Sequence, residues 1–215
     1  MADPAQGCDG LSRIRRSNPG SSAARLGLVS RLIDPDDSVL VLVDVQAGFV
    51  DRVEPERTAG LLDRIAFLAR SARFCGIPVI ATLETPEEWG ELHPAVRDEI
   101  GDAAVIRKEV FGLADDPAVW PAVRSADRST VVLAGLETDV CVAQSALGLL
   151  DRGMRVVVVE DTVASPGTAH AAGLERMRLA GTVPVVAKQL HYEWMRTVER
   201  SRAFDRANPA RLEHV

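Results

Sequence analysis

Six short apolar segments recur along the chain and restrict it to one broad fold class. They are rich in Val, Ile and Leu and show no regular alternation with polar residues, which is typical of strands covered on both faces in a parallel sheet. Segments with helical periodicity separate them, as the crossovers between parallel strands require. The predicted strands are residues 39–43, 77–82, 103–107, 131–134, 156–159 and 183–187.

The alternation of strands and helices predicts a three-layer α-β-α architecture. A six-stranded, mostly parallel sheet would carry helices on both faces, as in Rossmann-like folds. A TIM barrel would need eight such units. We predict a loop with a short helix over residues 84–101, a second short helix near residues 117–124, and longer helices at residues 55–74, 139–153, 165–180 and 190–204.

Length and composition are consistent with one domain. The chain has 215 residues, of which 47% are hydrophobic, enough for a sizeable core. Residues 1–24 are rich in Ser, Gly, Asp and Arg and contain few large apolar groups. Such a composition does not bury enough surface to offset the entropy of ordering, so we expect a disordered tail there and a single domain over residues 25–215.

Charge and cysteine content exclude several kinds of partner. A net charge of −6 disfavours nucleic acid, and no apolar run approaches the roughly 20 residues that span a bilayer. The three cysteines have no Cys-x-x-Cys spacing, so neither a zinc site nor a disulfide framework is predicted. Residues 17–24 do not form the apolar core of a signal peptide. We therefore expect a cytoplasmic protein with a small-molecule partner.

The segment around the fourth predicted strand carries a candidate nucleophile. Gly135 is expected to end the strand, and Thr138 or Asp139 to cap the following helix. Cys141 would then lie in the first helical turn, where unpaired N–H groups lower the pKa of a thiol. A free cysteine is also among the most commonly buried residues, so this segment alone leaves a core role open.

Two more polar residues follow predicted strands. Asp44 comes directly after the first strand and Lys108 directly after the third. Ligands of open parallel sheets bind beyond the carboxyl ends of the strands, which is the edge where Asp44, Lys108 and Cys141 are all expected. A carboxylate, an ammonium and a thiol at one site suit covalent acyl chemistry.

The chain resembles the isochorismatase-like cysteine hydrolases over roughly residues 33–196. The resemblance lies in V-L-V-D-V-Q-A-G-F at residues 41–49, R-K-E-V-F at residues 107–111 and G-L-E-T-D-V-C-V at residues 135–142. Nicotinamidases and N-carbamoylsarcosine amidases belong to this superfamily. It implies hydrolysis of a small-molecule amide, ureido or carbamoyl C–N bond through a thioester, with no cofactor, in a homo-oligomer.

The same resemblance implies a role for individual residues. Asp44 would be the general base, Lys108 its ion-pair partner and Cys141 the nucleophile. Backbone N–H groups near Val140 and Cys141 would bind the oxyanion, and the Leu136–Glu137 peptide bond would be cis. We also expect residues 190–204, which include Tyr192, Trp194 and Met195, to contribute to self-association; alternatively these side chains simply pack on the sheet.

Departures from the family pattern limit the choice of reaction. Nicotinamidases carry an Asp-x-His metal-binding arrangement after the second strand, whereas this chain has Thr82-Leu83-Glu84-Thr85, with His93 the nearest histidine. We therefore predict no metal and place the chain in a poorly characterised, metal-free branch. True isochorismatases generally lack the cysteine, but vinyl-ether hydrolysis and a non-catalytic, ligand-binding pseudoenzyme remain the alternatives. No G-x-G-x-x-G follows the first strand, which disfavours a dinucleotide-binding fold.

The substrate pocket is less well defined by sequence. Apolar walls and polar contacts are predicted from residues near the three motifs, although each aromatic could equally belong to the core. The candidate pocket residues are Gln46, Phe49, Glu84, Trp89, Phe111 and Trp120.

Overall fold

A computed structural model describes residues 31–209 and confirms the predicted α/β fold class. The predicted tail, residues 1–24, lies outside the described residues. All strand pairings are parallel, and the strand order is β3-β2-β1-β4-β5-β6. The strands are β1 (Ser38–Val43), β2 (Val79–Glu84), β3 (Ala104–Lys108), β4 (Thr130–Leu136), β5 (Arg155–Ala164) and β6 (Val183–Val185).

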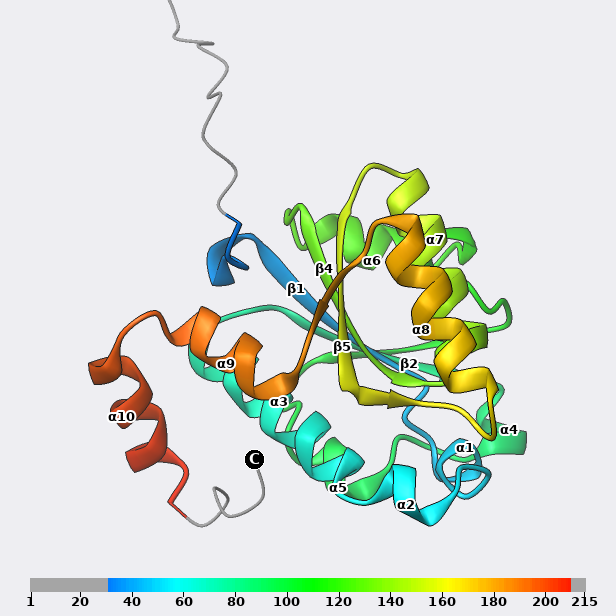
Figure 1. The fold of residues 1–215 in the computed structure, drawn as a ribbon, viewed down its shortest axis with the longest axis horizontal. Helices are drawn as coiled ribbons and strands as arrows, with labels where there is room; N and C mark the ends of the chain where they lie inside the picture. The colour runs from blue at the N-terminus through cyan, green and yellow to red at the C-terminus, as the bar shows by residue number, and fades with distance from the viewer. Residues whose placement is uncertain (1–30, 210–215) are drawn as a thin grey trace, which may run out of the picture.

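Helices cover both faces of the sheet (Figure 1). One face carries α3 (Leu61–Cys75) and α9 (Ala187–Met195), with α10 (Val198–Ala207) against α9. The other face carries α6 (Val119–Ser125), α7 (Ala143–Asp151) and α8 (Ala169–Ala180). The remaining short elements are η1 (Pro35–Asp37), α1 (Ala47–Val50), α2 (Pro55–Thr58), α4 (Pro86–Trp89), α5 (Pro94–Arg97), η2 (Leu113–Asp115) and η3 (Thr138–Val142).

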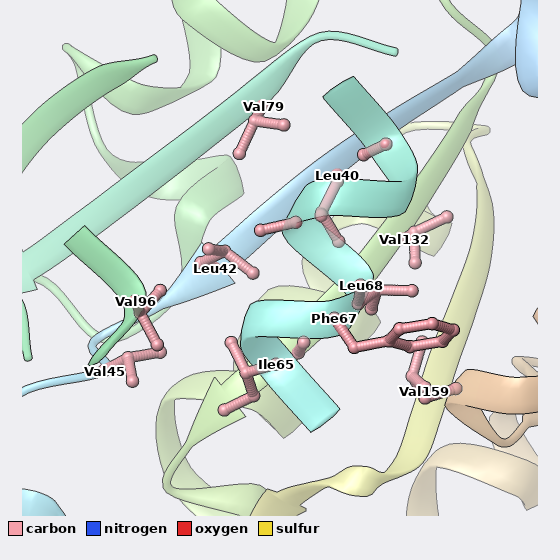
Figure 2. Packing of buried hydrophobic residues seen from close by; sticks show 14 of the residues in the cluster. Leu40, Leu42, Val45, Ile65, Phe67, Leu68, Val79, Val96, Val132 and Val159 are labelled. Carbon is pink, nitrogen blue, oxygen red and sulfur yellow. The ribbon is translucent and has the colours of Figure 1, made fainter. Parts of the chain in front are cut away.

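Strand β1, one of the two middle strands, has fully buried apolar side chains on both of its faces. Leu40 and Leu42 pack with Ile65 and Leu68 of α3 (Figure 2). The alternate residues Val39, Val41 and Val43 pack toward α6 and α7. Each fully buried side chain of this size contributes about 2 kcal/mol through removal of apolar surface from water. This double coverage explains why the sequence of β1 shows no polar alternation.

Two predicted helices are interrupted in the structure. The helix expected over residues 55–74 is divided into α2 and α3, because Gly60 adopts a left-handed backbone with φ +69°. The helix expected over residues 190–204 is divided at Arg196, which has φ +64°, and Thr197 caps α10 by accepting a hydrogen bond from the Arg200 N–H. Both breaks occur at residues whose φ is incompatible with a right-handed helix.

Four strands extend beyond their predicted ends: β2 reaches Glu84, β3 reaches Lys108, and β4 and β5 reach Leu136 and Ala164. β5 continues past Glu160 and Asp161 to Ala164, through an irregularity in its register with β4. Gly135 does not end β4, as we expected, but lies within it and pairs with Val43 of β1. A β-carbon at Gly135 would lie 2.0 Å from the Val43 carbonyl oxygen, and φ is +121°. The close approach of β1 and β4 therefore requires glycine at this position.

The strand order reverses its direction between β1 and β4. The chain leaves β1 toward β2 and β3 on one side, and later returns to build β4, β5 and β6 on the other. Connections from the carboxyl ends of β1 and β4 thus diverge, which is the arrangement that forms ligand sites in doubly wound sheets. Within residues 31–209, no helix combines the length and apolar character that crossing a bilayer requires.

We predict that Gly135→Ala destabilises the protein by about 3 kcal/mol or more, because the added methyl group overlaps the backbone of Val43. Chemical denaturation followed by circular dichroism would measure this loss. Gly153→Ala is the matched control, because Gly153 has φ +78° but open space around it. That variant should be destabilised only by the cost of holding alanine in a left-handed backbone conformation, about 1 kcal/mol. Equal losses in the two variants would contradict the steric explanation.

A histidine lies in the core between α3 and α10. His191 is buried, and its Nδ1 lies 2.9 Å from the Ser71 hydroxyl, which itself donates to the Phe67 carbonyl oxygen. Its ring also contacts the rings of Phe67 and Phe204, each at a centroid separation of 4.8 Å. Burial lowers the pKa of His191 to about 4, against the opposing charge of Asp205. The neutral imidazole is therefore the form that the folded protein favours.

We predict that stability falls as the pH is lowered from about 6.5 to about 4, since the unfolded chain binds a proton at His191 over this range and the folded protein does not. The loss from this residue should total about 3 kcal/mol. Urea denaturation at several pH values would measure it. In His191→Phe the slope should become shallower over the same range, and an unchanged slope would assign the pH dependence to other groups.

Candidate active site

The three predicted catalytic residues come together at the carboxyl edge of the sheet. Lys108 Nζ lies 2.7 Å from Asp44 Oδ2 and 3.6 Å from Cys141 Sγ. The side chains of Asp44 and Lys108 are both fully buried, and Cys141 is 2% exposed. The site thus consists of a carboxylate, an ammonium and a thiol within contact distance, shielded from water.

A second carboxylate completes the surroundings of the ammonium. Glu84 is the last residue of β2 and the register partner of Lys108 on β3. Its Oε2 lies 3.5 Å from Lys108 Nζ and accepts a hydrogen bond from the Cys141 thiol at 3.1 Å. We expected β2 to end at Thr82, and this two-residue extension is what aligns Glu84 with Lys108. The predicted pocket residue Glu84 therefore contacts the nucleophile directly.

The backbone at Asp44 is left-handed, with φ +48°. Strand alternation would place this side chain on the same face as Leu40 and Leu42, whereas its contacts lie on the opposite face. The positive φ interrupts the alternation, and aspartate is among the residues that tolerate this conformation. Thr82 holds the carboxylate by donating its hydroxyl to Asp44 Oδ1 at 2.8 Å, and its Oγ1 accepts from the Asp44 N–H at 3.3 Å.

Cys141 lies in a π-helical turn, η3, that precedes α7. We predicted that Thr138 or Asp139 caps this turn, but neither side chain does so. The Thr138 hydroxyl lies 2.9 Å from His170 Nδ1, and Asp139 Oδ1 accepts a hydrogen bond from the Ser165 hydroxyl. The predicted lowering of the thiol pKa is also wrong: burial raises the pKa of Cys141, and the negative charge of Asp44 raises it further, against the opposing effect of Lys108. The thiol is therefore protonated until a base removes its proton.

Lys108 remains charged despite its burial. Desolvation lowers the pKa of the ammonium, but the negative charges of Asp44 and Glu84, together with that of Cys141 when its thiol is ionised, outweigh it and raise that pKa above its ordinary value. For Asp44 the balance differs: burial raises the pKa of the carboxyl, and Lys108 opposes this effect. The ammonium is thus the cation around which the anionic groups of the site are arranged.

Three residues of this cluster could in principle bind a metal ion. One ligand atom from each of Asp44, Glu84 and Cys141 lies within 4.8 Å of the others. The ammonium of Lys108, however, lies 2.7 to 3.6 Å from the same three side chains. A divalent cation there would be repelled by this fixed positive charge, so the donor set does not suit a metal ion while Lys108 is protonated.

Gln46 holds the backbone beside the site. Its side chain is fully buried, and its amide group donates to the carbonyl oxygens of Glu84 at 3.0 Å and Gly90 at 2.6 Å. Gln46 Oε1 accepts a hydrogen bond from the Glu84 N–H at 2.8 Å. The amide is thus bonded to the backbone of β2 and of the loop that follows, and a contact of Gln46 with a substrate remains a prediction.

An aromatic pair lies beside this support. Phe49 of α1 stacks on Trp89 of α4 with a centroid separation of 4.6 Å, and Phe49 belongs to the core. The Arg52 guanidinium lies over the Trp89 ring at 5.3 Å and also 3.8 Å from Glu137, the residue that follows β4. Burial raises the pKa of Glu137, and Arg52 opposes this effect. These contacts connect the aromatic pair to the turn that carries Cys141.

The other two predicted pocket aromatics differ in position. Phe111 is 48% exposed, three residues after Lys108, and its contact with a substrate remains a prediction. Trp120 lies 4.7 Å from the guanidinium of Arg152, which follows the far end of α7. Arg152 comes eleven residues after Cys141, a distance of about 16 Å along a helix axis. A contact of Trp120 with a substrate also remains a prediction.

One backbone N–H group near the nucleophile already forms a hydrogen bond within the turn. The Leu136–Glu137 peptide bond is cis. The Val140 N–H donates to the Glu137 carbonyl oxygen at 3.2 Å, so this predicted oxyanion donor already has an acceptor. The roles of Val140 and Cys141 N–H groups toward a substrate remain predictions.

Sequence reasoning did not identify Thr82 or Arg52 as parts of the site. Thr82 is the polar member of an otherwise apolar run and shares a strand face with Glu84, which is a usable signal for a buried hydrogen-bonding role. Arg52 gave no such signal, because a lone arginine after a short helix is usually solvated.

Comparison with known proteins places the chain in a family. The isochorismatase domain matches residues 38–189. The probable hydrolase YcaC of Escherichia coli is 29% identical over 176 residues, covering 78% of this chain and 84% of its own. The secreted isochorismatase effector Isc1 of Phytophthora sojae is 32% identical over 168 residues, covering 75% and 76%.

Solved structures agree with this assignment. YcaC from Pseudomonas aeruginosa, solved with hexane-2,5-diol and covalent acrylamide, has a TM-score of 0.73 and 26% identity, covering 81% of this chain and 90% of its own. The structure of the E. coli YcaC gene product, described as an octameric hydrolase of unknown specificity, also has a TM-score of 0.73, at 24% identity over 82% and 90% of the two chains.

We predict that Lys108→Met destabilises the protein by about 3 to 5 kcal/mol, because it leaves the Asp44 carboxylate buried without its counter-charge. Thermal or urea denaturation would measure the loss. The double variant Lys108→Met with Asp44→Asn should recover part of it, since no unpaired charge then remains at Asp44. If the double variant were less stable by the full sum of the two single losses, the ion pair would not be the cause.

Proposed function

The chain belongs to the isochorismatase domain family, and from this premise we propose that it is a cysteine-dependent hydrolase of a small-molecule amide, ureido or carbamoyl C–N bond. Family membership supports hydrolase activity in general. The C–N bond specificity is our inference from the presence of a thiol where a nucleophile is needed.

The observation that carries this proposal is the contact of the Cys141 thiol with a charged, buried ion pair. Lys108 Nζ lies 3.6 Å from Sγ, close enough to stabilise the thiolate formed when the proton leaves. Asp44, at 2.7 Å from the same ammonium, is the carboxylate that the family resemblance names as base. A buried thiol beside a fixed cation and two carboxylates is suited to acyl transfer.

The proposed reaction has two halves. The thiol loses its proton to a carboxylate, and the sulfur adds to the substrate carbonyl carbon; the C–N bond then breaks as the proton passes to the leaving nitrogen. Water next adds to the thioester carbon, the C–S bond breaks, and the thiol recovers its proton. Backbone N–H groups that face the developing oxyanion typically contribute about 3 to 4 kcal/mol each to such a step.

A non-catalytic, ligand-binding role is the second candidate. The raised pKa of Cys141 favours it, because a thiol that stays protonated is inert until a base acts on it. Vinyl-ether hydrolysis would not need the cysteine. The proposed thioester chemistry differs from both in requiring Cys141 for turnover.

We also propose self-association and a cytoplasmic location. The octameric state of the E. coli relative supports the first. We predicted that Trp194 and Met195 contribute to self-association, but both are buried in the core. The exposed apolar side chains of α9 and α10 that could contact another subunit are Tyr192 and Val198. The free thiols of Cys75 and Cys141 fit a reducing compartment, although the relative Isc1 is a secreted protein.

We predict that Cys141→Ala abolishes turnover without loss of fold. A panel of small amides, ureas and carbamoyl compounds would be assayed for ammonia or amine release. Cys75→Ala is the control, because Cys75 lies at the end of α3, outside the site, and should retain wild-type rates. Release that persists in Cys141→Ala would exclude the thioester route.

A further inference from the structure

The rim of the site carries a carboxylate whose hydrogen bonds are incomplete. Glu137 directly follows β4 and precedes the η3 turn that holds Cys141. Its side chain is 13% exposed, and its Oε1 is buried with no hydrogen-bond partner among residues 31–209. A buried carboxylate oxygen is normally satisfied by a donor, because leaving it unpaired costs free energy. Glu137 is therefore a group at the site to which a donor can still bind.

The cation nearest to this carboxylate is held weakly. Arg52 Nε lies 3.8 Å from Glu137 Oε1, which is longer than a hydrogen bond, and the Arg52 side chain is 50% exposed. Its guanidinium also lies 5.3 Å from the centre of the Trp89 ring. Ion pairs and cation–π contacts at such exposed positions contribute little free energy. Another cation that reaches Glu137 can therefore displace Arg52 at small cost.

The electrostatic surroundings of Glu137 favour a second positive charge. Burial raises the pKa of Glu137, Arg52 opposes this effect, and the negative charges of Asp139 and Glu84 raise the pKa further. The ammonium of Lys108 is already paired with a carboxylate on the floor of the site. The rim thus carries more negative than positive charge, which repels an anionic ligand and attracts a cationic one.

We propose that Glu137 and Trp89 form a cation subsite, which Arg52 covers in the free protein, and that the substrate is an amide, ureido or carbamoyl compound with an ammonium or guanidinium group. This inference rests on the proposed hydrolysis at Cys141 and adds the class of compound that the site accepts. The face of the indole ring attracts a cation, and the carboxylate pairs with it. Both groups already contact a guanidinium of the chain itself, so their spacing suits a cation.

A cation bound at this subsite would also assist the reaction. Cys141 is a buried thiol, and both its burial and the negative charge of Asp44 disfavour ionisation. A positive charge brought by the substrate lowers the free energy of the thiolate. The nucleophile is therefore activated when a substrate of this charge is bound, and the subsite favours the reaction of the compounds that it selects.

Two thiol reagents of similar length and opposite charge test the subsite without any substrate. They are 2-aminoethyl and 2-sulfonatoethyl methanethiosulfonate, each of which transfers its thioethyl arm to a cysteine thiolate as a mixed disulfide and releases methanesulfinate. Peptide mapping by mass spectrometry would give the rate at Cys141 with each reagent. The ratio of the two rates, divided by the same ratio for 2-mercaptoethanol, measures charge preference, because the thiolate fraction cancels.

We predict that wild-type Cys141 prefers the ammonium reagent by a ratio of about 10 or more, because the rim carries excess negative charge. In Glu137→Gln the ratio should fall about fivefold, since the carboxylate of the subsite is lost. In Arg52→Met it should rise, because the competing guanidinium is removed. Arg52 is half-exposed, so this second variant is expected to fold even if Glu137→Gln does not.

Two controls separate the subsite from a general effect of charge. Cys75 of the same protein lies at the end of α3, outside the site, and should give a ratio near that of the free thiol. Glu199→Gln removes one negative charge from an exposed residue of α10, on the opposite side of the molecule from α1 and α4 (Figure 1). That variant should leave the ratio at Cys141 unchanged.

A ratio at Cys141 that favours the sulfonate reagent, or one that Glu137→Gln leaves unchanged, would show that the subsite does not bind cations. A Cys141 that neither reagent modifies would also contradict the inference, because a charged substrate group of this size then does not reach the site.

Amide turnover gives the second readout. β-Alaninamide and succinamate differ in carrying an ammonium or a carboxylate at the same distance from the amide, and the wild type should hydrolyse the ammonium compound about 10-fold faster. Faster hydrolysis of succinamate would contradict the inference. Failure of the proposed function looks different: no amide in the panel would then be hydrolysed, while the reagent ratio at Cys141 would still depend on Glu137.

Discussion

The arrangement of this site depends on one buried ammonium. Lys108 is 1% exposed, and it lies within 3.6 Å of an atom from each of Asp44, Glu84 and Cys141. Transfer of a charge from water into a protein interior costs several kcal/mol, which nearby opposite charges offset only when the geometry is close. The two carboxylates satisfy this requirement, and their positions are therefore as constrained as that of the lysine itself.

Close backbone packing brings the nucleophile to this cation. Gly135 allows β4 to approach β1 immediately before the chain turns toward Cys141. Gly173 of α8 plays a similar part on the other side, since a β-carbon there would lie 2.8 Å from the Asp139 backbone. With a larger residue at either glycine, the η3 turn would have to move, and a shift of 1 Å is enough to disrupt a catalytic geometry.

The rim of the site differs in character from its floor. Asp44 and Lys108 are buried at the carboxyl ends of strands and Cys141 in the turn after β4, whereas Arg52, Trp89 and Glu137 come from short helices and turns and are partly accessible. A rigid sheet that positions the reacting groups, with variable loops that contact the substrate, is the usual division in doubly wound enzymes.

Much of the fold and the three central residues followed from the sequence. Continuous apolar runs that alternate with helices are typical of a covered parallel sheet, and the carboxyl ends of its strands meet at one edge, so Asp44, Lys108 and Cys141 were expected together. The contact of Glu84 with the thiol was not predictable, because it depends on β2 extending two residues further than its apolar run.

The sequence by itself therefore determined the order of the elements and the chemical types gathered at the sheet edge, since both follow from local periodicity and from strand polarity. Only the tertiary structure decided which atoms touch. The left-handed backbone at Asp44 reverses the face to which its side chain points, and the raised pKa of Cys141 results from burial and from the charge of Asp44. Both depend on groups far apart in the chain, because the direction of a side chain and the dielectric around it are set by whatever packs against it.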